Sequence, residues 1–443
     1  MVASVRSVFR GLVPVLLTLL AGSCAPAAPP GSPSPDGHDH TPEEVAALVS
    51  GTPSEVAAAA VARCGRRSAA RKQGCYEPVL LGVLHTQGVR PAMQALDSVV
   101  ARDRDVRRDA HQYAHAIGIA AYAGPQEVEK TFAGCTPEHQ SGCYHGVIQA
   151  HFVDALRRGG EITAETVNSL CRAYQGPAGD RWLEFQCAHG MGHGVVMFRG
   201  HDLPVALRDC DLLESPFQRE TCYHGAFMEN VVNAVAPHHA AASLLRGEGR
   251  AAGHGGGDAH AHHHGGGADT SATRFRALDP EDPLYPCTVM EERYLAACYS
   301  MQTSVILHHN RYDVAAAARA CERVPARWRT TCFVSLGRDI SGISARSRPE
   351  AIRRCSLVES PTDQSWCHVG VATNMLNVTA RAEDGLAYCR EVTGEENKTR
   401  CYRAIGEQLL VLEDGIEGRE AACRGAEPEH VEACRRGARL AER

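Results

Sequence analysis

The chain has 443 residues, a formal net charge of −6 and only 5% aromatic residues. This mild negative charge argues against a nucleic-acid-binding protein and against a polybasic membrane-binding patch. The length permits a large core or several domains, and abundant alanine and arginine beside few aromatic residues favour helices over strands.

Residues 1–23 have the pattern of an export signal, because Arg6 and Arg10 precede the short apolar run GLVPVLLTLLAG. This run is too short to span a membrane as a helix. The sequence LAGSC that follows resembles the lipobox of bacterial lipoproteins, with Ala21 where leucine is usual. The resemblance implies cleavage before Cys24 and a lipid on its sulfur. We therefore expect a lipid-anchored protein of the cell envelope, with simple secretion as the alternative.

The remaining chain divides by composition into four segments. Residues 24–45 begin with the proline-rich stretch APAAPPGSPSPDGHDH, which predicts a tether without a core. Two regions of expected helical repeats follow, at 46–245 and 276–443. Between them, residues 246–275 are rich in glycine and histidine, which predicts a flexible loop. Its clustered histidines can capture a metal ion weakly: His254, His260, His262, His263 and His264.

Nineteen cysteines are many for a reducing cytosol and are reasonable in an exported protein. Without Cys24 they number eighteen and fall into nine neighbouring pairs. Because antiparallel helices bring such pairs within bonding range, we predict one local disulfide for each pair. The pairs are Cys64–Cys75, Cys135–Cys143, Cys171–Cys187, Cys210–Cys222, Cys287–Cys298, Cys321–Cys332, Cys355–Cys367, Cys389–Cys401 and Cys423–Cys434.

The cysteines also reveal a repeat, since the first members of the last five pairs recur every 34 residues. Each unit has an apolar-striped run, a short polar turn and a second amphipathic run that opens with the second cysteine, as in RYDVAAAARAC, ERVPARWRTTC and CFVSLGRDIS. We predict an all-α solenoid of about ten helical hairpins, one of them without cysteines between Cys75 and Cys135. The period is similar to that of tetratricopeptide and Sel1-like repeats, and the resemblance covers the architecture only.

Histidine recurs at one position of this repeat, two residues after the second cysteine. His145, His189 and His224 occupy it, and His111 aligns with them in the hairpin without cysteines. Six other units have different residues there: Glu77, Ser300, Val334, Val369, Arg403 and Arg436. The scaffold therefore does not require histidine at this position. Because equivalent positions of a solenoid face one surface, we expect these imidazoles to lie side by side.

Two further histidines follow at i, i+4 spacing, which places His111 with His115 and His189 with His193 on one helix face. Along the chain this gives two sets of three imidazoles, which we expect to converge in one cavity. Three neutral imidazoles suit a catalytic zinc ion, and two such sets equal the ligand count of coupled dicopper sites. Nickel and iron also accept imidazole. We predict a transition metal, copper or zinc, bound by His111, His115, His145, His189, His193 and His224.

Other residues near these histidines are secondary candidates. Glu229, five residues after His224, is a candidate carboxylate ligand or general base, with a capping or solvated role as the alternative. His139 and His151 are spare ligands at most. His308, His309 and His368 lie off the shared repeat position, and we interpret them as surface or structural residues. Gly190 has the pattern of a helix-packing glycine. Gly192 and Gly194 indicate close approach of a ligand or of another backbone.

The sequence leaves two functions open. The first is an exported metal-binding protein with one or two ions in its N-terminal repeats, which as an enzyme would be a copper-dependent oxidoreductase or a zinc-dependent hydrolase. The second is a disulfide-stapled scaffold that binds a peptide or an envelope protein on its concave face, with histidines at the surface or in a pH-sensitive contact. For both functions we expect the protein to contact the membrane through its N-terminal lipid and to bind no nucleic acid. The sequence contains no CxxCH, HExxH, Walker A or GxSxG motif.

Overall fold

The computed structural model describes residues 42–176, 179–235, 275–413 and 415–440, which form helices and turns without a β-strand. The predicted all-α solenoid is therefore confirmed for this part of the chain. The expected signal peptide, Cys24, and the five clustered loop histidines lie outside the described residues. The first helix, α1 (Pro42–Leu48), begins within the last residues of the expected tether.

Five hairpins make up the N-terminal half. They are α2 (Pro53–Cys64) with α3 (Ala69–Gln87), α4 (Val89–Arg102) with α5 (Arg104–Ala121), α6 (Val128–Gly134) with α7 (Gly142–Arg157), α8 (Ala164–Leu170) with α9 (Arg181–Phe198), and α10 (Leu203–Cys210) with α11 (Pro216–Val235). The C-terminal half contains α13 (Leu295–His309) and then α14 (Val314–Glu322) with α15 (Ala326–Ile343), α16 (Arg348–Cys355) with α17 (Pro361–Thr379), α18 (Ala382–Glu391) with α19 (Glu395–Leu412), and α20 (Ile416–Cys423) with α21 (Val431–Gly437).

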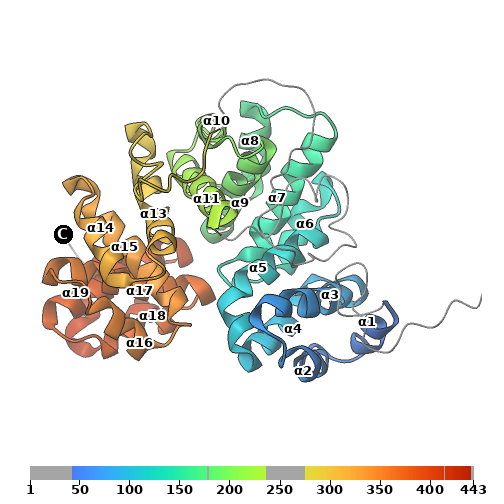
Figure 1. Cartoon of the computed structure of the whole chain (residues 1–443), viewed down its shortest axis with the longest axis horizontal. Coiled ribbons are helices and arrows are strands. Elements are labelled where there is room, and N and C mark those ends of the chain that lie inside the picture. Colours follow the sequence, from blue (N-terminus) through green and yellow to red (C-terminus); the bar gives the residue numbers. More distant parts are fainter. Residues whose placement is uncertain (1–41, 177–178, 236–274, 414, 441–443) are drawn as a thin grey trace, which may run out of the picture.

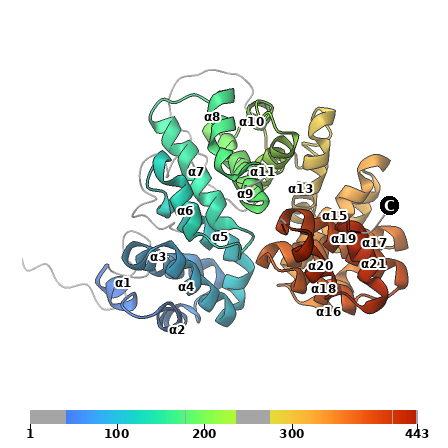
Figure 2. The ribbon, with the colours of Figure 1, turned by 180° about the vertical axis from the view of Figure 1, so that it is seen from behind.

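The second helices of successive units form one continuous row through the molecule. Each helix from α3, α5, α7, α9 and α11 to α13, α15, α17, α19 and α21 packs against the next (Figure 1). The C-terminal half turns back toward the first, so that the backbone N–H of Gln140 donates to the carbonyl of Val378 at 3.3 Å. Figure 2 shows the two halves from behind. No helix of the described residues is long and apolar enough to cross a membrane.

All nine predicted disulfides are present, and each closes within one unit. Their Cα–Cα distances lie between 5.5 and 5.8 Å, within the range that a disulfide requires. The bonded cysteines are all buried. Each disulfide therefore holds the two arms of its own unit together, and among the described residues no disulfide joins one unit to the next.

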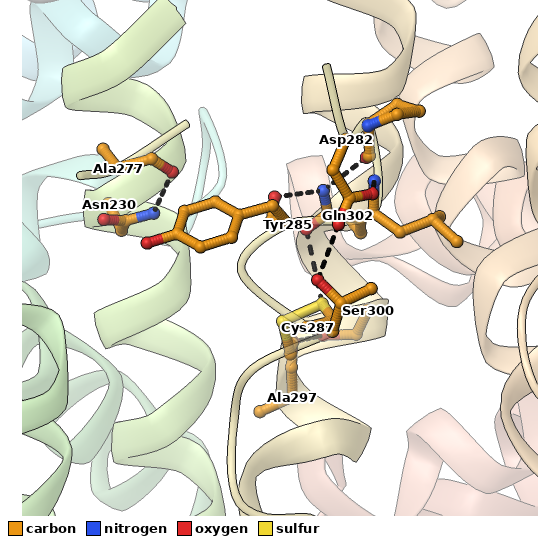
Figure 3. Close-up of a disulfide and its surroundings, with 12 residues drawn as sticks. Asn230, Ala277, Asp282, Tyr285, Cys287, Ala297, Ser300 and Gln302 are labelled. Carbon is orange, nitrogen blue, oxygen red and sulfur yellow. Dashed lines mark hydrogen bonds between the residues drawn. A yellow bond between two sulfur atoms is a disulfide. The ribbon is translucent and has the colours of Figure 1, made fainter. Parts of the chain in front are cut away.

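The sixth unit differs from the predicted hairpin, because residues 275–291 form turns and not a first helix. Their sequence includes DPEDPLYP, and each proline lacks the N–H that a helix needs. Side chains of the neighbouring helices hold this segment (Figure 3). Gln302 on α13 donates to the carbonyls of Pro283 at 2.7 Å and Tyr285 at 2.8 Å, while Asn230 on α11 donates to another carbonyl of the segment at 3.3 Å.

Glycines permit very close crossings between second helices. A methyl group on Gly192 of α9 would lie 2.2 Å from the carbonyl oxygen of Cys222 on α11. In the reverse direction, a methyl group on Gly225 of α11 would lie 2.0 Å from the carbonyl oxygen of His189. The predicted close approach of another backbone at Gly192 is confirmed. Any larger residue at these positions forces the two helices apart.

The same reciprocal arrangement recurs between α5 and α7, α15 and α17, and α19 and α21, through Gly118 with Gly146, Gly337 with Gly370, and Gly406 with Gly437. Gly190 is a helix-packing residue as expected, since a methyl group there would lie 3.1 Å from the Ile148 side chain. Gly194 lies against the ring of Phe152, at 2.3 Å for an added methyl group. It therefore accommodates an aromatic side chain and not a backbone.

Substitution of Gly225 by alanine is expected to lower the free energy of unfolding by about 2–3 kcal/mol, because overpacking must displace a backbone carbonyl. Chemical denaturation measures this loss. Gly342→Ala is the matched control, since a methyl group on this helical glycine meets no atom within 4 Å. It should leave stability unchanged or raise it slightly. Equal stability of the two variants would contradict the close crossing.

Candidate metal centre

The predicted histidines lie on four consecutive second helices. His111 and His115 are on α5, His145 is on α7, His189 and His193 are on α9, and His224 is on α11 with Glu229. Helices α5 and α9 each begin at an aspartate whose side chain accepts a hydrogen bond from the first turn. The residue after the shared histidine position on α7, α9 and α11 is a packing glycine, which sets that histidine at a helix crossing: Gly146, Gly190 and Gly225.

Five of the six histidines converge around His145. The centroid of its ring lies 5.7 Å from that of His111, 4.7 Å from that of His189 and 5.3 Å from that of His193. The two i, i+4 pairs also meet, since the rings of His115 and His193 are 5.4 Å apart. The expectation that both pairs share one region is therefore met by the geometry.

Within this cluster, potential ligand atoms gather in two groups of three. One nitrogen from each of His111, His115 and His145 lies within 4.8 Å of the others, and the same holds for His145, His189 and His193. We call the first the outer group, because His111 is half-buried, and the second the inner group, because all three of its residues are buried. His145 belongs to both.

His224 joins neither group, so the expected second set of His189, His193 and His224 is not the one that the structure forms. Its Nδ1 is 2.9 Å from the hydroxyl oxygen of Ser300 on α13, the next second helix. His145 takes the place that we expected for His224. The reason is that the solenoid provides His224 with a hydrogen-bond partner on its other side.

Hydrogen bonds to buried side chains orient two of the central imidazoles. Nε2 of His145 donates to Oε1 of Gln186 at 3.0 Å, and Nδ1 of His193 donates to Oε2 of Glu229 at 2.8 Å. Because these oxygens only accept, each ring carries its lone pair on the other nitrogen. Nδ1 of His145 and Nε2 of His193 are buried without a hydrogen-bond partner among the described residues. Nδ1 of His189 is in the same situation.

The outer histidines are oriented in the same way. Nδ1 of His111 donates to the backbone carbonyl of His139 at 2.9 Å, and Nδ1 of His115 donates to Oε1 of Gln149 at 3.2 Å. The Gln149 amide in turn donates to the sulfur of Met197. Four imidazoles thus direct one N–H each to an oxygen acceptor. Ligands of metal ions in proteins are commonly held by such bonds to carboxylates and carbonyls.

Burial keeps the central imidazoles neutral. It lowers the pKa of His145 well below its ordinary value, and the neighbouring His193 and His111 lower it further. Burial also lowers the pKa of His189 well below the ordinary value, with His145 adding to the effect. A neutral imidazole keeps the lone pair that a metal ion needs, whereas a protonated one has lost it.

Glu229 is buried and contacts His193, so its position is that of an orienting carboxylate and not of a member of either ligand group. Two residues escaped the sequence analysis, Gln149 and Gln186. Gln149 has a signal that was available, since it lies four residues after His145, where the repeat has His115 and His193 in the neighbouring helices. Gln186 has none beyond its position before Cys187.

Three of the remaining histidines have partners outside the ligand groups. His139 is buried, and its Nε2 lies 2.7 Å from Oδ1 of Asp97. The Nδ1 of His151 lies 3.5 Å from the Tyr122 hydroxyl. His368 is structural as expected, because it is buried and its Nδ1 lies 2.7 Å from the Tyr388 hydroxyl.

Acidification below pH 6.5 is expected to destabilise the metal-free protein, and His368 should carry a measurable part of this effect. Burial lowers its pKa to about 4, so the folded state stays neutral while the unfolded chain takes up a proton. Its contribution is complete above pH 6.5 and is lost as the pH falls toward 4. Denaturation with a chelator present at pH 7 and pH 4.5 should show a fall about 2 kcal/mol smaller for His368→Gln than for the parent. Parallel falls would contradict the assignment.

The donor set fits a transition-metal ion. Each buried nitrogen without a partner costs about 1–3 kcal/mol, and a metal ion in the inner group would take up lone pairs that no protein group uses. The candidate ligands are neutral imidazoles, which suit zinc, copper, nickel and iron. Comparisons with protein-family models, with curated proteins and with solved structures found no match for this chain.

Proposed function

We propose that this chain is an exported metal-binding protein that holds one copper or zinc ion in a buried histidine centre formed by α5, α7 and α9. The observation that carries the proposal is the direction of the imidazoles. Four of them donate an N–H to oxygen acceptors, and in the inner group Nδ1 of His145, Nδ1 of His189 and Nε2 of His193 are buried without a hydrogen-bond partner among the described residues. The candidate ligands are His111, His115, His145, His189 and His193.

The number of ions follows from His145, which both groups need. Its Nε2 is engaged by Gln186, so Nδ1 is the one nitrogen left for a metal. That nitrogen completes the outer group or the inner group, but not both at once. We therefore expect one ion per chain and not the pair that two separate sets of three would hold.

Copper and zinc are the favoured ions because the candidate ligands are neutral nitrogen donors without a carboxylate or thiolate. Imidazole suits both, and copper stands highest in the affinity order of divalent metals. Glu229 adds a negative charge behind His193 and strengthens its donor nitrogen. The disulfides leave no thiolate among the described residues to compete for the ion, and they are compatible with the oxidising compartment of an exported protein.

Metal analysis of the purified protein tests this proposal. The chain should be produced without a polyhistidine tag, with the five loop histidines replaced by serine, and then incubated with Cu²⁺ or Zn²⁺ and desalted. We expect inductively coupled plasma mass spectrometry to find close to one equivalent of bound metal per chain. Less than about a tenth of an equivalent of either ion would favour the scaffold that binds a peptide or an envelope protein.

We also propose that the chain is anchored to the cell envelope through Cys24. The nine disulfides use every cysteine except this one, and they are compatible with an oxidising compartment. The expected result is a diacylglycerol-modified N-terminal peptide in the mass spectrum of membrane fractions. Cys24→Ala should release the protein from the membrane fraction, and an unmodified peptide from the parent would exclude the anchor.

A further inference from the structure

A small cavity lies where the two halves of the solenoid meet, and it reaches the outer histidine group. Its volume is about 80 Å³. Residues of α5 and of the turn before α7 line one side, and residues of the C-terminal half line the other. The lining residues that matter are Arg107, Arg108, His111, His139, Arg346 and Asn374.

The cavity is strongly positive. Three arginines line it, and no aspartate or glutamate is among its lining residues. Arg108 already pairs with Asp109 at 2.9 Å. Among the described residues, the hydrogen bonds of the Arg107 and Arg346 side chains go to backbone carbonyls, and neither side chain forms an ion pair. These two guanidinium groups, one from each half, therefore keep donor capacity for a ligand.

Arg346 is the arginine whose charged form this arrangement destabilises most clearly. Burial lowers its pKa, and the charge of Arg107 lowers it further, while the charge of Asp384 outside the lining offsets this only in part. Two like charges beside one cavity repel each other, and nothing in the lining offsets them. A bound anion would remove this repulsion and accept hydrogen bonds from both groups. The forked guanidinium matches the geometry of carboxylate and phosphate oxygens.

His111 connects the cavity to the metal centre. It lines the cavity, belongs to the outer group and is only half-buried, whereas the inner group is enclosed. His139, whose carbonyl accepts the hydrogen bond from His111, lines the same cavity. His111 is thus the residue that the cavity and the outer group share.

We propose that this cavity binds a small oxyanion, of the carboxylate or phosphate class, next to the outer group, which is one of the two positions that the proposed function allows for its metal ion. The volume is about that of three water molecules, which matches the size of acetate or inorganic phosphate. The C-terminal half then has a role in binding, because it supplies Arg346 and one wall of the site.

Two measurements on the full chain test the two parts of the proposal. Calorimetry tests whether the cavity binds an oxyanion, and absorption spectroscopy tests whether the anion lies next to the metal ion. Acetate and inorganic phosphate are titrated into metal-free protein, with chloride at equal ionic strength as the control. The same anions are added to protein loaded with Co²⁺, whose visible spectrum reports on its ligands. We expect saturable binding of at least one oxyanion to the metal-free protein and a change in the cobalt spectrum at the same concentrations.

Matched variants locate the binding. Arg346→Ala and Arg107→Ala should each weaken oxyanion binding about tenfold or more, whereas Arg346→Lys keeps the charge and should lose less. Arg353→Ala is the control, since Arg353 is exposed on α16 and pairs with Glu350. Thermal unfolding verifies that all variants are folded. The two cavity variants rest on different halves, so failure of one to fold leaves the other as a test.

The outcomes are distinct. Cobalt binding without any oxyanion binding overturns this inference and leaves the proposed function intact. Absence of cobalt binding contradicts the proposed function, while calorimetry on the metal-free chain still decides whether the cavity binds an oxyanion. If Arg353→Ala weakens binding as much as Arg346→Ala, the anions respond to diffuse surface charge and the cavity site is wrong.

Discussion

Complete reduction of the nine disulfides will unfold the protein at room temperature. Each bond closes a loop of 8 to 16 residues within one unit. In the chain-entropy account, loops of this size stabilise the folded state by roughly 2–3 kcal/mol each. Nine such contributions exceed the 5–15 kcal/mol by which most domains are stable. Circular dichroism after prolonged incubation with a strong reductant should show loss of the helical signal.

Single-bridge variants provide the control for this prediction. Replacing Cys423 and Cys434 by serine removes the last staple, which lies in the terminal unit with one neighbour. Replacing Cys171 and Cys187 removes the staple of the unit that carries α9. Each should lower stability by about 2–4 kcal/mol and leave a folded protein. A fully reduced chain that keeps its helical signal and its melting temperature would show that packing between units suffices.

Substitution of His145 by alanine should weaken metal binding at least 100-fold, more than substitution of any other histidine of the cluster. Both groups lose their third ligand at once, because His145 is the residue that they share. Removal of His111 or His193 leaves one group of three complete. Competition with a chromophoric chelator measures the affinity, and thermal unfolding of the metal-free variants shows whether they are folded.

His224→Ala is the matched control for this variant. His224 occupies the same repeat position as His145 on a second helix of the same row, but its partner is Ser300 and it joins neither ligand group. Burial lowers its pKa to about 4, so it is also a neutral imidazole. We expect its removal to change metal affinity less than threefold. Equal losses for the two variants would mean that six histidines, and not five, form the centre.

The fold was predictable from the sequence because its main signals are local. The spacing of cysteine pairs fixes the hairpin, and the period of 34 residues fixes the stacking. Both survive in the structure, including the hairpin without cysteines. The sixth unit departs from the pattern where prolines follow one another at 280, 283 and 286. The repeat of 34 residues was inferred from the cysteine positions alone, and these do not reveal that the prolines interrupt the first helix of this unit.

The candidate site was predictable in its composition but not in its grouping. Repeat alignment identifies which residues share a face, and five of the six histidines do converge. Alignment does not show which neighbouring helix provides a hydrogen-bond partner for each histidine. His224 bonds to Ser300 on α13, and His145 is therefore the third member of the inner group. The arginine cavity could not be predicted from the sequence, because Arg107 and Arg346 are 239 residues apart and meet only where the C-terminal half of the solenoid contacts the N-terminal half.

Every disulfide is confined to a single unit, and this confinement bears on how the molecule opens. In a stacked array, units can separate one joint at a time, since covalent links inside a unit do nothing to hold the next one. An ion held by His145 on α7 together with the histidine pair of α5, or with that of α9, would join two successive units to each other. Removal of the ion would let these two units separate from each other while every disulfide stays intact.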